Sequence, residues 1–168
     1  ANEGNAVGLA AGYYLSTGKM GVVYLQNSGE GNIVNPLMSL ADPKVYSIPI
    51  LLIIGWRGEP GIRDEPQHIK QGEVTLKLLE TMGVEYRILS DDFENDLNYL
   101  VDLAKKDNKP TALIIRKGSF SKYLSIKEEE TVMGELLREE ALEIILKELG
   151  NDLVVSTTGK ESREVFEL

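Results

Sequence analysis

The chain has 168 residues, 42% of them hydrophobic and 27% charged, which is typical of a globular protein that buries one substantial core. Its formal net charge of -9 disfavours nucleic acids and anionic membranes as partners, because both are negatively charged and no basic stripe offsets the acidic excess. The absence of cysteine excludes disulfides and thiolate metal sites, and it is compatible with the cytoplasmic location that we expect.

No apolar run is long enough to predict a membrane-spanning helix. The longest, residues 48–55, contains Pro49 and is typical of a buried strand. The chain begins with Ala-Asn-Glu-Gly rather than with Met, and we therefore expect it to be a piece of a longer protein.

The first predicted elements are a helix, a strand and a second helix. Small apolar residues recur over 5–17, which predicts a tightly packed helix that ends at Gly18. A strand is predicted at 21–26, followed by a glycine-containing loop at 27–32 and a helix through Leu40.

The alternation continues with strands at 50–54, 85–89 and 111–116, a loop at 56–67, and helices near 70–82 and 92–106. Alternating helices and nearly all-apolar strands predict the α/β class, doubly wound around a mainly parallel sheet. The pattern breaks at 118–134, which we interpret as a linker. A helix at 135–149, a strand at 152–156 and the start of another helix follow, and they predict the opening of a second domain.

Glu3 is the first candidate for chemistry, because it stands at the start of the small-residue helix. A favourable interaction with the helix dipole is the simpler explanation of an acid there. A catalytic role would need a partly apolar pocket, where desolvation raises the pKa of the acid enough for it to share a proton with a bound heterocycle. Spacing alone does not decide between these interpretations.

The loop at 27–32 is the second candidate, because open α/β sheets bind ligands at the carboxyl ends of their strands. Gly29 and Gly31 would let a ligand approach the backbone closely. A plain tight turn is the alternative. A dinucleotide site is a poor fit, since Val34 occupies the position of the third glycine of that motif.

Residues 55–72 form the third candidate, because loops of such length are often lids or binding loops. Arg57, Arg63 and His68 could bind an anionic substrate through planar donors and point charges. The acids of the segment nearly cancel these charges, so a solvated loop with internal ion pairs is an equally good interpretation. A lone histidine does not indicate a metal site.

The turn at 156–162 is the fourth candidate, because its backbone amides and hydroxyls could receive a phosphate at a helix start. It is not a Walker loop, since Val154 and Glu161 occupy positions where that motif has glycine and Ser or Thr.

Together these motifs resemble the pyrimidine-binding domain of thiamine-diphosphate-dependent decarboxylases and synthases. In that domain an acid stands before a small-residue helix, and a strand and a Ser/Thr-Gly loop follow. Here Glu3 corresponds to the acid and residues 27–32 correspond to the loop. Residues 55–61, 64–68 and 156–160 are similar to phosphonopyruvate decarboxylases in particular, and the likeness extends along essentially the whole chain.

The resemblance implies the thiamine-diphosphate-binding fold, truncated at both ends. Residues 1–117 would be a pyrimidine-binding domain that lacks its first strand, 118–134 a linker, and 135–168 the first helix, strand and helix of a diphosphate-binding domain. The family's metal motif, Gly-Asp-Gly followed by Asn, does not occur before Leu168, so we expect no metal ligand in this chain and no activity from it alone.

The resemblance also implies that phosphonopyruvate is decarboxylated to phosphonoacetaldehyde and carbon dioxide, with thiamine diphosphate and Mg²⁺ as cofactors. Glu3 would be catalytic, through a hydrogen bond to the pyrimidine ring of the cofactor. The other implied cofactor-binding residues are Asn27, Ser28, Gly29, Thr157, Thr158 and Gly159, and the implied substrate-binding residues are Arg57, Arg63 and His68. Since the cofactor of this family commonly lies between subunits, we expect a homo-oligomer, at least a dimer.

Two alternatives stay open. One is a decarboxylase of the same superfamily that acts on sulfopyruvate or another small 2-oxoacid. The other is a noncatalytic domain that binds a ligand, against which the acid at Glu3 argues mildly.

Overall fold

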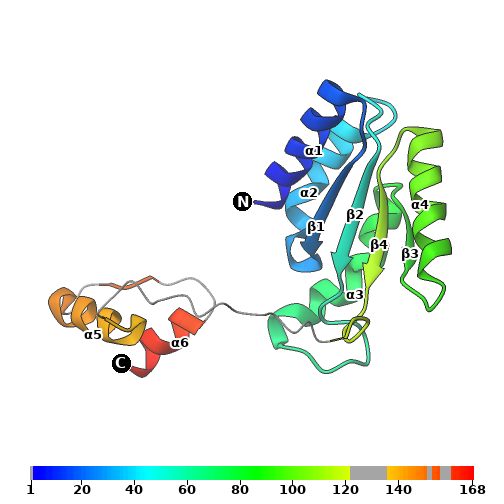
Figure 1. Ribbon diagram of the computed structural model, residues 1–168. Coiled ribbons are helices and arrows are strands. Elements are labelled where there is room, and N and C mark those ends of the chain that lie inside the picture. The colour runs from blue at the N-terminus through cyan, green and yellow to red at the C-terminus, as the bar shows by residue number, and fades with distance from the viewer. Residues whose placement is uncertain (1, 122–135, 151–152, 156–159) are drawn as a thin grey trace. The chain divides into compact units, whose positions relative to one another are not determined.

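The computed structural model describes residues 2–121, 136–150, 153–155 and 160–168 (Figure 1). It divides into two compact units, Ala1–Lys122 and Tyr123–Leu168. The division falls inside the predicted linker at 118–134, most of which lies outside the described residues.

Four strands form the sheet of the first unit: β1 (Gly21–Gln26), β2 (Ile50–Gly55), β3 (Glu85–Ile88) and β4 (Thr111–Ile115). Their order across the sheet is β1-β2-β4-β3, and every neighbouring pair is parallel. The order differs from chain order because the chain passes from β2 to the far edge before β4 returns between them. The predicted α/β class with a parallel sheet is confirmed.

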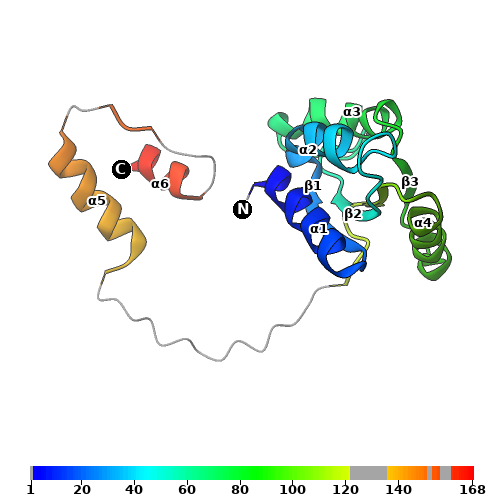
Figure 2. The same ribbon diagram turned by 90° about the horizontal axis from the view of Figure 1, so that it is seen from above.

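Helices cover both faces of this sheet. The helical segments of the unit are α1 (Glu3–Thr17), a 3₁₀ turn η1 (Asn27–Gly29), α2 (Glu30–Pro36), a π-helical turn η2 (Leu37–Ala41), α3 (Pro66–Thr81) and α4 (Phe93–Asp107). Figure 2 shows α2 and α3 on one side of the strands and α4 on the other.

Strand alternation divides the apolar side chains between two cores. Ile50, Leu52 and Ile54 of β2 point into the larger core, to which α1, α2 and α3 also contribute. Leu51 points into the smaller core beneath α4, where it joins Leu100. A strand buried on both faces is typical of a parallel sheet, and it explains the continuous apolar run at this position in the sequence.

Helix α3 begins earlier than the sequence pattern predicts. It starts at Pro66, whose fixed φ and missing N–H suit the first helical position, whereas the prediction began near residue 70. The preceding connection is therefore shorter than expected, and His68 lies in the first turn of α3 instead of in a loop.

The second unit contains α5 (Arg138–Leu149) and α6 (Lys160–Glu167). The helix predicted at 135–149 is confirmed from Arg138 onward. The strand predicted at 152–156 is wrong within the described residues, since 153–155 have no strand conformation. A strand needs a hydrogen-bonded neighbour, and the described residues of this unit contain none. No described helix in either unit has the length and apolar character needed to cross a bilayer.

Candidate functional site

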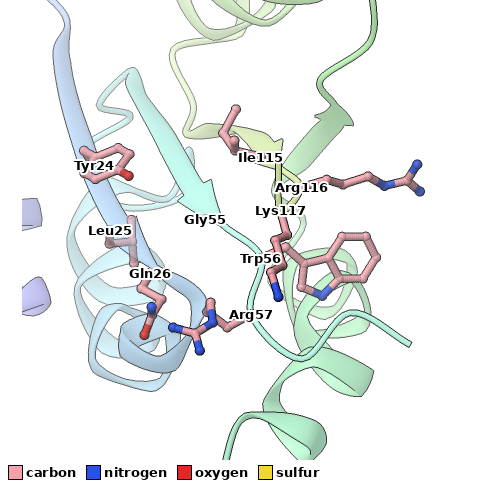
Figure 3. Close-up of a pocket in the computed structure, with 9 residues that line it drawn as sticks. All are labelled: Tyr24, Leu25, Gln26, Gly55, Trp56, Arg57, Ile115, Arg116 and Lys117. Atoms are coloured by element: carbon pink, nitrogen blue, oxygen red, sulfur yellow. The ribbon is translucent and has the colours of Figure 1, made fainter. Parts of the chain in front are cut away.

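The carboxyl ends of β1, β2 and β4 surround a pocket of about 530 Å³. Figure 3 shows its nine lining residues, three from each strand end: Tyr24, Leu25, Gln26, Gly55, Trp56, Arg57, Ile115, Arg116 and Lys117. Three of these residues are basic and none is acidic, although the chain as a whole carries a net charge of -9. The pocket is therefore suited to a small anion.

Arg57 is held in the pocket wall by Asp64. The Asp64 carboxylate accepts hydrogen bonds from Arg57 Nε at 2.8 Å and from Nη2 at 2.5 Å, so the guanidinium is bound in a bidentate manner. Asp64 uses only two of the five guanidinium N–H groups, and the Arg57 side chain is 38% exposed. A fixed guanidinium with remaining donors can bind a ligand without a large loss of side-chain entropy.

Asp64 also organises the connection from β2 to α3. It accepts hydrogen bonds from the backbone N–H groups of Gly58 and Glu65, both at 2.8 Å, and its Oδ1 lies 3.2 Å from Nδ1 of His68. These donors, Arg57 first, hold the pKa of Asp64 far below its usual value despite its burial. The carboxylate is thus charged and structural.

Lys117 and Arg116 bring two further positive charges to the pocket from the end of β4. Lys117 Nζ has a long contact of 3.5 Å with the carbonyl oxygen of Arg63. Arg116 pairs with Glu59 at 2.9 Å, and Figure 3 shows its side chain pointing away from the other lining residues. Lys117 is therefore less committed to internal contacts than Arg116 is.

The turn after β1 is fixed by Asn27, which is 2% exposed. Its side-chain amide accepts from the backbone N–H of Arg57 at 2.9 Å and donates to the carbonyl of Arg57 at 2.8 Å, so it binds the end of β2 as a neighbouring strand would. The same Nδ2 donates to Oγ1 of Thr75 on α3 at 2.9 Å. Asn27 thus joins β1, β2 and α3 at the site.

Ser28 lies exposed on the same turn. Its hydroxyl donates to Oε1 of Gln26 at 2.6 Å, and its carbonyl oxygen accepts a long hydrogen bond of 3.4 Å from Nε2 of Gln71. Ser28 therefore connects the pocket residue Gln26 to the turn of η1.

Glu3 contacts the same turn from the first residue of α1. A Cβ atom added to Gly29 would lie only 2.3 Å from Cδ of Glu3, so the carboxyl group rests on a position that only glycine can occupy without displacing it. Asn32 Nδ2 donates to Oε2 of Glu3 at 2.8 Å. Gly29 and Asn32 together seat the carboxyl group at the carboxyl edge of the sheet.

The environment of Glu3 differs from the one that a catalytic acid would need. The hydrogen bond from Asn32 is the main cause that lowers the pKa of Glu3 below its usual value, and desolvation opposes it only weakly because the side chain is half-buried. The raised pKa required by the catalytic interpretation is therefore not present in the chain by itself. Another group that covers Glu3 would have to supply it.

The structure thus brings Glu3, Asn27, Ser28 and Gly29 together around one turn. Arg57 lines the neighbouring pocket, whereas His68 faces Asp64 and the side chain of Arg63 is exposed; neither of these two lines the pocket. Thr157, Thr158 and Gly159 lie outside the described residues.

Sequence reasoning missed Arg116, Lys117 and Glu30. Arg116 ends a predicted strand and Lys117 directly follows it, and this position at a strand end was the available signal. Glu30 is 2% exposed, and burial raises its pKa to about 7 from a usual value of 4.5. Within the described part of the chain, no group of three or more His, Cys, Asp or Glu side chains could hold a metal ion.

The sequence matches the family model described as "Thiamine pyrophosphate enzyme, N-terminal TPP binding domain" over residues 1–79. A phosphonopyruvate decarboxylase of Streptomyces viridochromogenes is 35% identical, and the alignment covers 99% of this chain and 46% of the relative. A sulfopyruvate decarboxylase subunit alpha of Methanothermobacter thermautotrophicus is 32% identical, with 67% of each chain covered. The chain belongs to the thiamine pyrophosphate enzyme family.

Membership of the thiamine pyrophosphate enzyme family, whose cofactor is also called thiamine diphosphate, confirms the resemblance drawn from the motifs. A second sulfopyruvate decarboxylase subunit alpha, from Methanococcus maripaludis, is 43% identical over 50% of this chain and 48% of its own. The chain spans about half the length of the phosphonopyruvate decarboxylases that it matches. The model match ends within α3 and therefore includes α1, β1 and the turn that seats Glu3.

Proposed function

We propose that this chain is the pyrimidine-binding part of a decarboxylase that uses thiamine diphosphate to convert phosphonopyruvate to phosphonoacetaldehyde and carbon dioxide. The observation that carries the proposal is the 35% identity to phosphonopyruvate decarboxylases across 99% of the chain. The basic pocket supports it, because phosphonopyruvate carries both a phosphonate and a carboxylate group. The cytoplasmic location and a place in phosphonate biosynthesis belong to the same proposal.

The residues around η1 fit the pyrimidine ring of the cofactor. Oε1 of Glu3 lies against Gly29, whose missing side chain makes room for the carboxyl group, while Oε2 is already bound by Asn32. Glu3 would bind a ring nitrogen and control its proton, and Asn27, Ser28 and Gly29 would form the wall. When bound, thiamine diphosphate supplies a nucleophilic carbon and an electron sink for the decarboxylation.

The low pKa of Glu3 supports a site completed by another domain or subunit. A carboxyl group can share a proton near neutrality only when desolvation raises its pKa, and the half-exposed Glu3 lacks that cover here. We therefore propose a homo-oligomer, at least a dimer, in which Mg²⁺ and the diphosphate group are held by residues outside the described part of this chain. The role of Thr157, Thr158 and Gly159 in that part stays a prediction.

The substrate would bind in the basic pocket next to this turn. Arg57, fixed by Asp64, offers its remaining N–H donors to one acidic group, and Lys117 supplies a second positive charge from the end of β4. His68 would act indirectly through Asp64, and Arg63 is exposed on the connection from β2 to α3. We thus place Lys117 beside Arg57 as a substrate-binding residue.

Sulfopyruvate is the second candidate substrate. It shares the 2-oxoacid group and differs in the charge of its second acidic group, and two relatives named sulfopyruvate decarboxylase subunit alpha match about half to two thirds of this chain. The basic pocket accommodates either anion, so the two substrates have to be compared directly.

The proposal is tested by the release of carbon dioxide from phosphonopyruvate and from sulfopyruvate, with thiamine diphosphate and Mg²⁺ supplied to the assembled protein. We expect phosphonopyruvate to give the higher kcat/KM. Glu3→Gln should lower kcat by two orders of magnitude or more without changing the circular dichroism spectrum, because it removes the proton-sharing group. Glu94→Gln, an exposed acid in the first turn of α4, is the matched control. Release from sulfopyruvate alone would reassign the substrate, and release from neither would refute the activity.

A further inference from the structure

Glu30 is a buried acid that the proposed chemistry leaves without a role. It is the first residue of α2 and only 2% exposed, and its Oε1 has no hydrogen-bond partner within the described residues. A buried carboxylate that lacks donors is strongly unfavourable, whereas a neutral carboxylic acid is much less so. The geometry therefore favours the protonated form.

The hydrogen bonds of Thr75 lead to the same conclusion. A hydrogen bond donated by the Thr75 hydroxyl to the Glu30 carboxyl group would lower the pKa of Glu30, but this hydroxyl accepts from Asn27 at 2.9 Å and donates to the carbonyl of Gln71 at 2.8 Å. A hydroxyl has one proton and two acceptor sites, so Thr75 has no second proton for Glu30 but can still accept one. A protonated Glu30 completes this network, and an ionised Glu30 does not. Burial accordingly raises the pKa of Glu30 to about 7.

The position of Glu30 connects this network to the catalytic acid. Glu30 lies between Gly29 and Asn32, the two residues that seat the carboxyl group of Glu3. Its partner Thr75 also anchors Asn27, at the start of the same turn. A movement of Glu30 toward water would therefore displace the support of Glu3.

We propose that Glu30 is a positioning residue that, as a neutral acid bonded to Thr75, holds the turn Asn27–Gly29 and the first turn of α2 in the geometry that seats Glu3. Ionisation of Glu30 releases this turn, and Glu3 then loses its position. The inference rests on the proposed function only in the assignment of Glu3 as the catalytic acid; the link from Glu30 to Asn32 does not depend on it.

Among the described residues, the side chain that acts on the Glu30 carboxyl group is the uncharged Thr75 of α3, which in turn accepts a hydrogen bond from Asn27 of η1. The titratable groups reached next through the network and across Gly29 are Arg57, Asp64, His68 and Glu3. Asp64 and Arg57 stay charged between pH 5 and 9, because their mutual hydrogen bonds shift their pKa values away from that range. A transition near pH 7 that Glu30→Gln removes is thus specific to Glu30.

The first test is an NMR titration of the whole chain between pH 5 and 9. The side-chain NH₂ of Asn32 and the backbone amide of Gly29 report the seat of Glu3, and we expect both to shift with a midpoint near pH 7. Glu30→Gln should abolish this transition while preserving the fold, and Glu94→Gln should retain it. A transition that persists in Glu30→Gln overturns the proposal. So does a ¹³C titration of the Glu30 carboxyl group with a midpoint near 4.5, a measurement on the unsubstituted chain that needs no variant to fold.

The second test is the pH profile of carbon dioxide release by the assembled protein. At pH 8 roughly a tenth of Glu30 stays neutral, so kcat should fall about tenfold from pH 6 to 8 while KM changes little. Glu30→Gln should flatten this decline, and Glu30→Leu, which cannot donate to Thr75, should have a low kcat at every pH. A decline that is the same in Glu30→Gln overturns the positioning role. If no carbon dioxide is released at any pH, the proposed function fails, and the NMR titration alone still decides the role of Glu30.

Discussion

Replacement of Asp64 by alanine should destabilise the first unit by roughly 2–4 kcal/mol. Asp64 is 6% exposed and accepts four hydrogen bonds, two from Arg57 and one each from the backbone of Gly58 and Glu65. Hydrogen bonds to a charged group contribute about 1.5–3 kcal/mol each when they are buried. The pair with Arg57 contributes less than a buried ion pair, because the arginine is 38% exposed and screened by water. The backbone hydrogen bonds from Gly58 and Glu65 supply the rest of the expected loss.

Equilibrium unfolding in urea, followed by circular dichroism, measures this effect. Glu73→Ala is the control: it removes an ion pair with Lys70 whose two side chains are 48% and 83% exposed, so little change is expected. A free energy of unfolding for Asp64→Ala within about 0.5 kcal/mol of that of the unsubstituted chain would refute the anchoring role. Such a small change is in the range of ordinary surface substitutions.

The pH dependence of unfolding tests whether the charged form of Asp64 stabilises the fold. Because the pKa of Asp64 in the folded chain is lower than its usual 3.8, the charged form stabilises the fold fully above that value, and this contribution is lost as the pH falls. Between pH 5 and pH 2 the unsubstituted chain should therefore lose more stability than Asp64→Asn does. Equal losses in the two proteins would contradict a structural charge at this position.

Two further substitutions test the site. Gly29→Ala adds a Cβ atom that would lie 2.3 Å from Cδ of Glu3. Because the flexible carboxyl end of Glu3 can move aside, we expect a normal melting temperature but a kcat lower by roughly two orders of magnitude. A normal kcat would contradict the position assigned to Glu3. Lys117→Met should raise the KM for phosphonopyruvate roughly tenfold with little change in kcat, because it removes a charge that binds ground state and transition state alike. An unchanged KM would remove Lys117 from the substrate site.

The order of helices and strands in the first unit could be predicted from the sequence because its signals are local. Three of the four strands are short, mainly apolar runs, and α1 ends at Gly18, which adopts a positive φ of 70° that disfavours other residues. The strand predicted at 152–156 lacks such support, since an apolar run becomes a strand only when another strand pairs with it. The local sequence pattern was sufficient to predict the elements of the first unit, but it was insufficient at residues 152–156.

The composition of the pocket could not be predicted, because it depends on strand order. Arg57 follows β2 and Lys117 follows β4, and these strands are neighbours only because β3 lies outside β4 at the edge of the sheet. The sequence left open whether the basic residues of the segment 55–72 bind a ligand or form ion pairs with the acids of the same segment. Asp64 pairs with Arg57, and His68 faces the same carboxylate, so the internal ion pairs and a pocket-lining arginine occur together.

Glu3 and Glu30 show why burial, rather than residue type, assigns the two acids of this site. Both stand at the first residue of a helix in the structure, where the helix dipole favours a carboxylate. The half-exposed Glu3 accepts from Asn32, and its pKa is lowered; Glu30 is buried among uncharged groups, and its pKa is raised. The fold itself therefore sets the protonation of Glu30, whereas that of Glu3 changes when a ligand or another domain covers it. Two acids beside one turn whose pKa values are shifted in opposite directions would, under the proposed function, allow Glu30 to hold the site while Glu3 handles the proton.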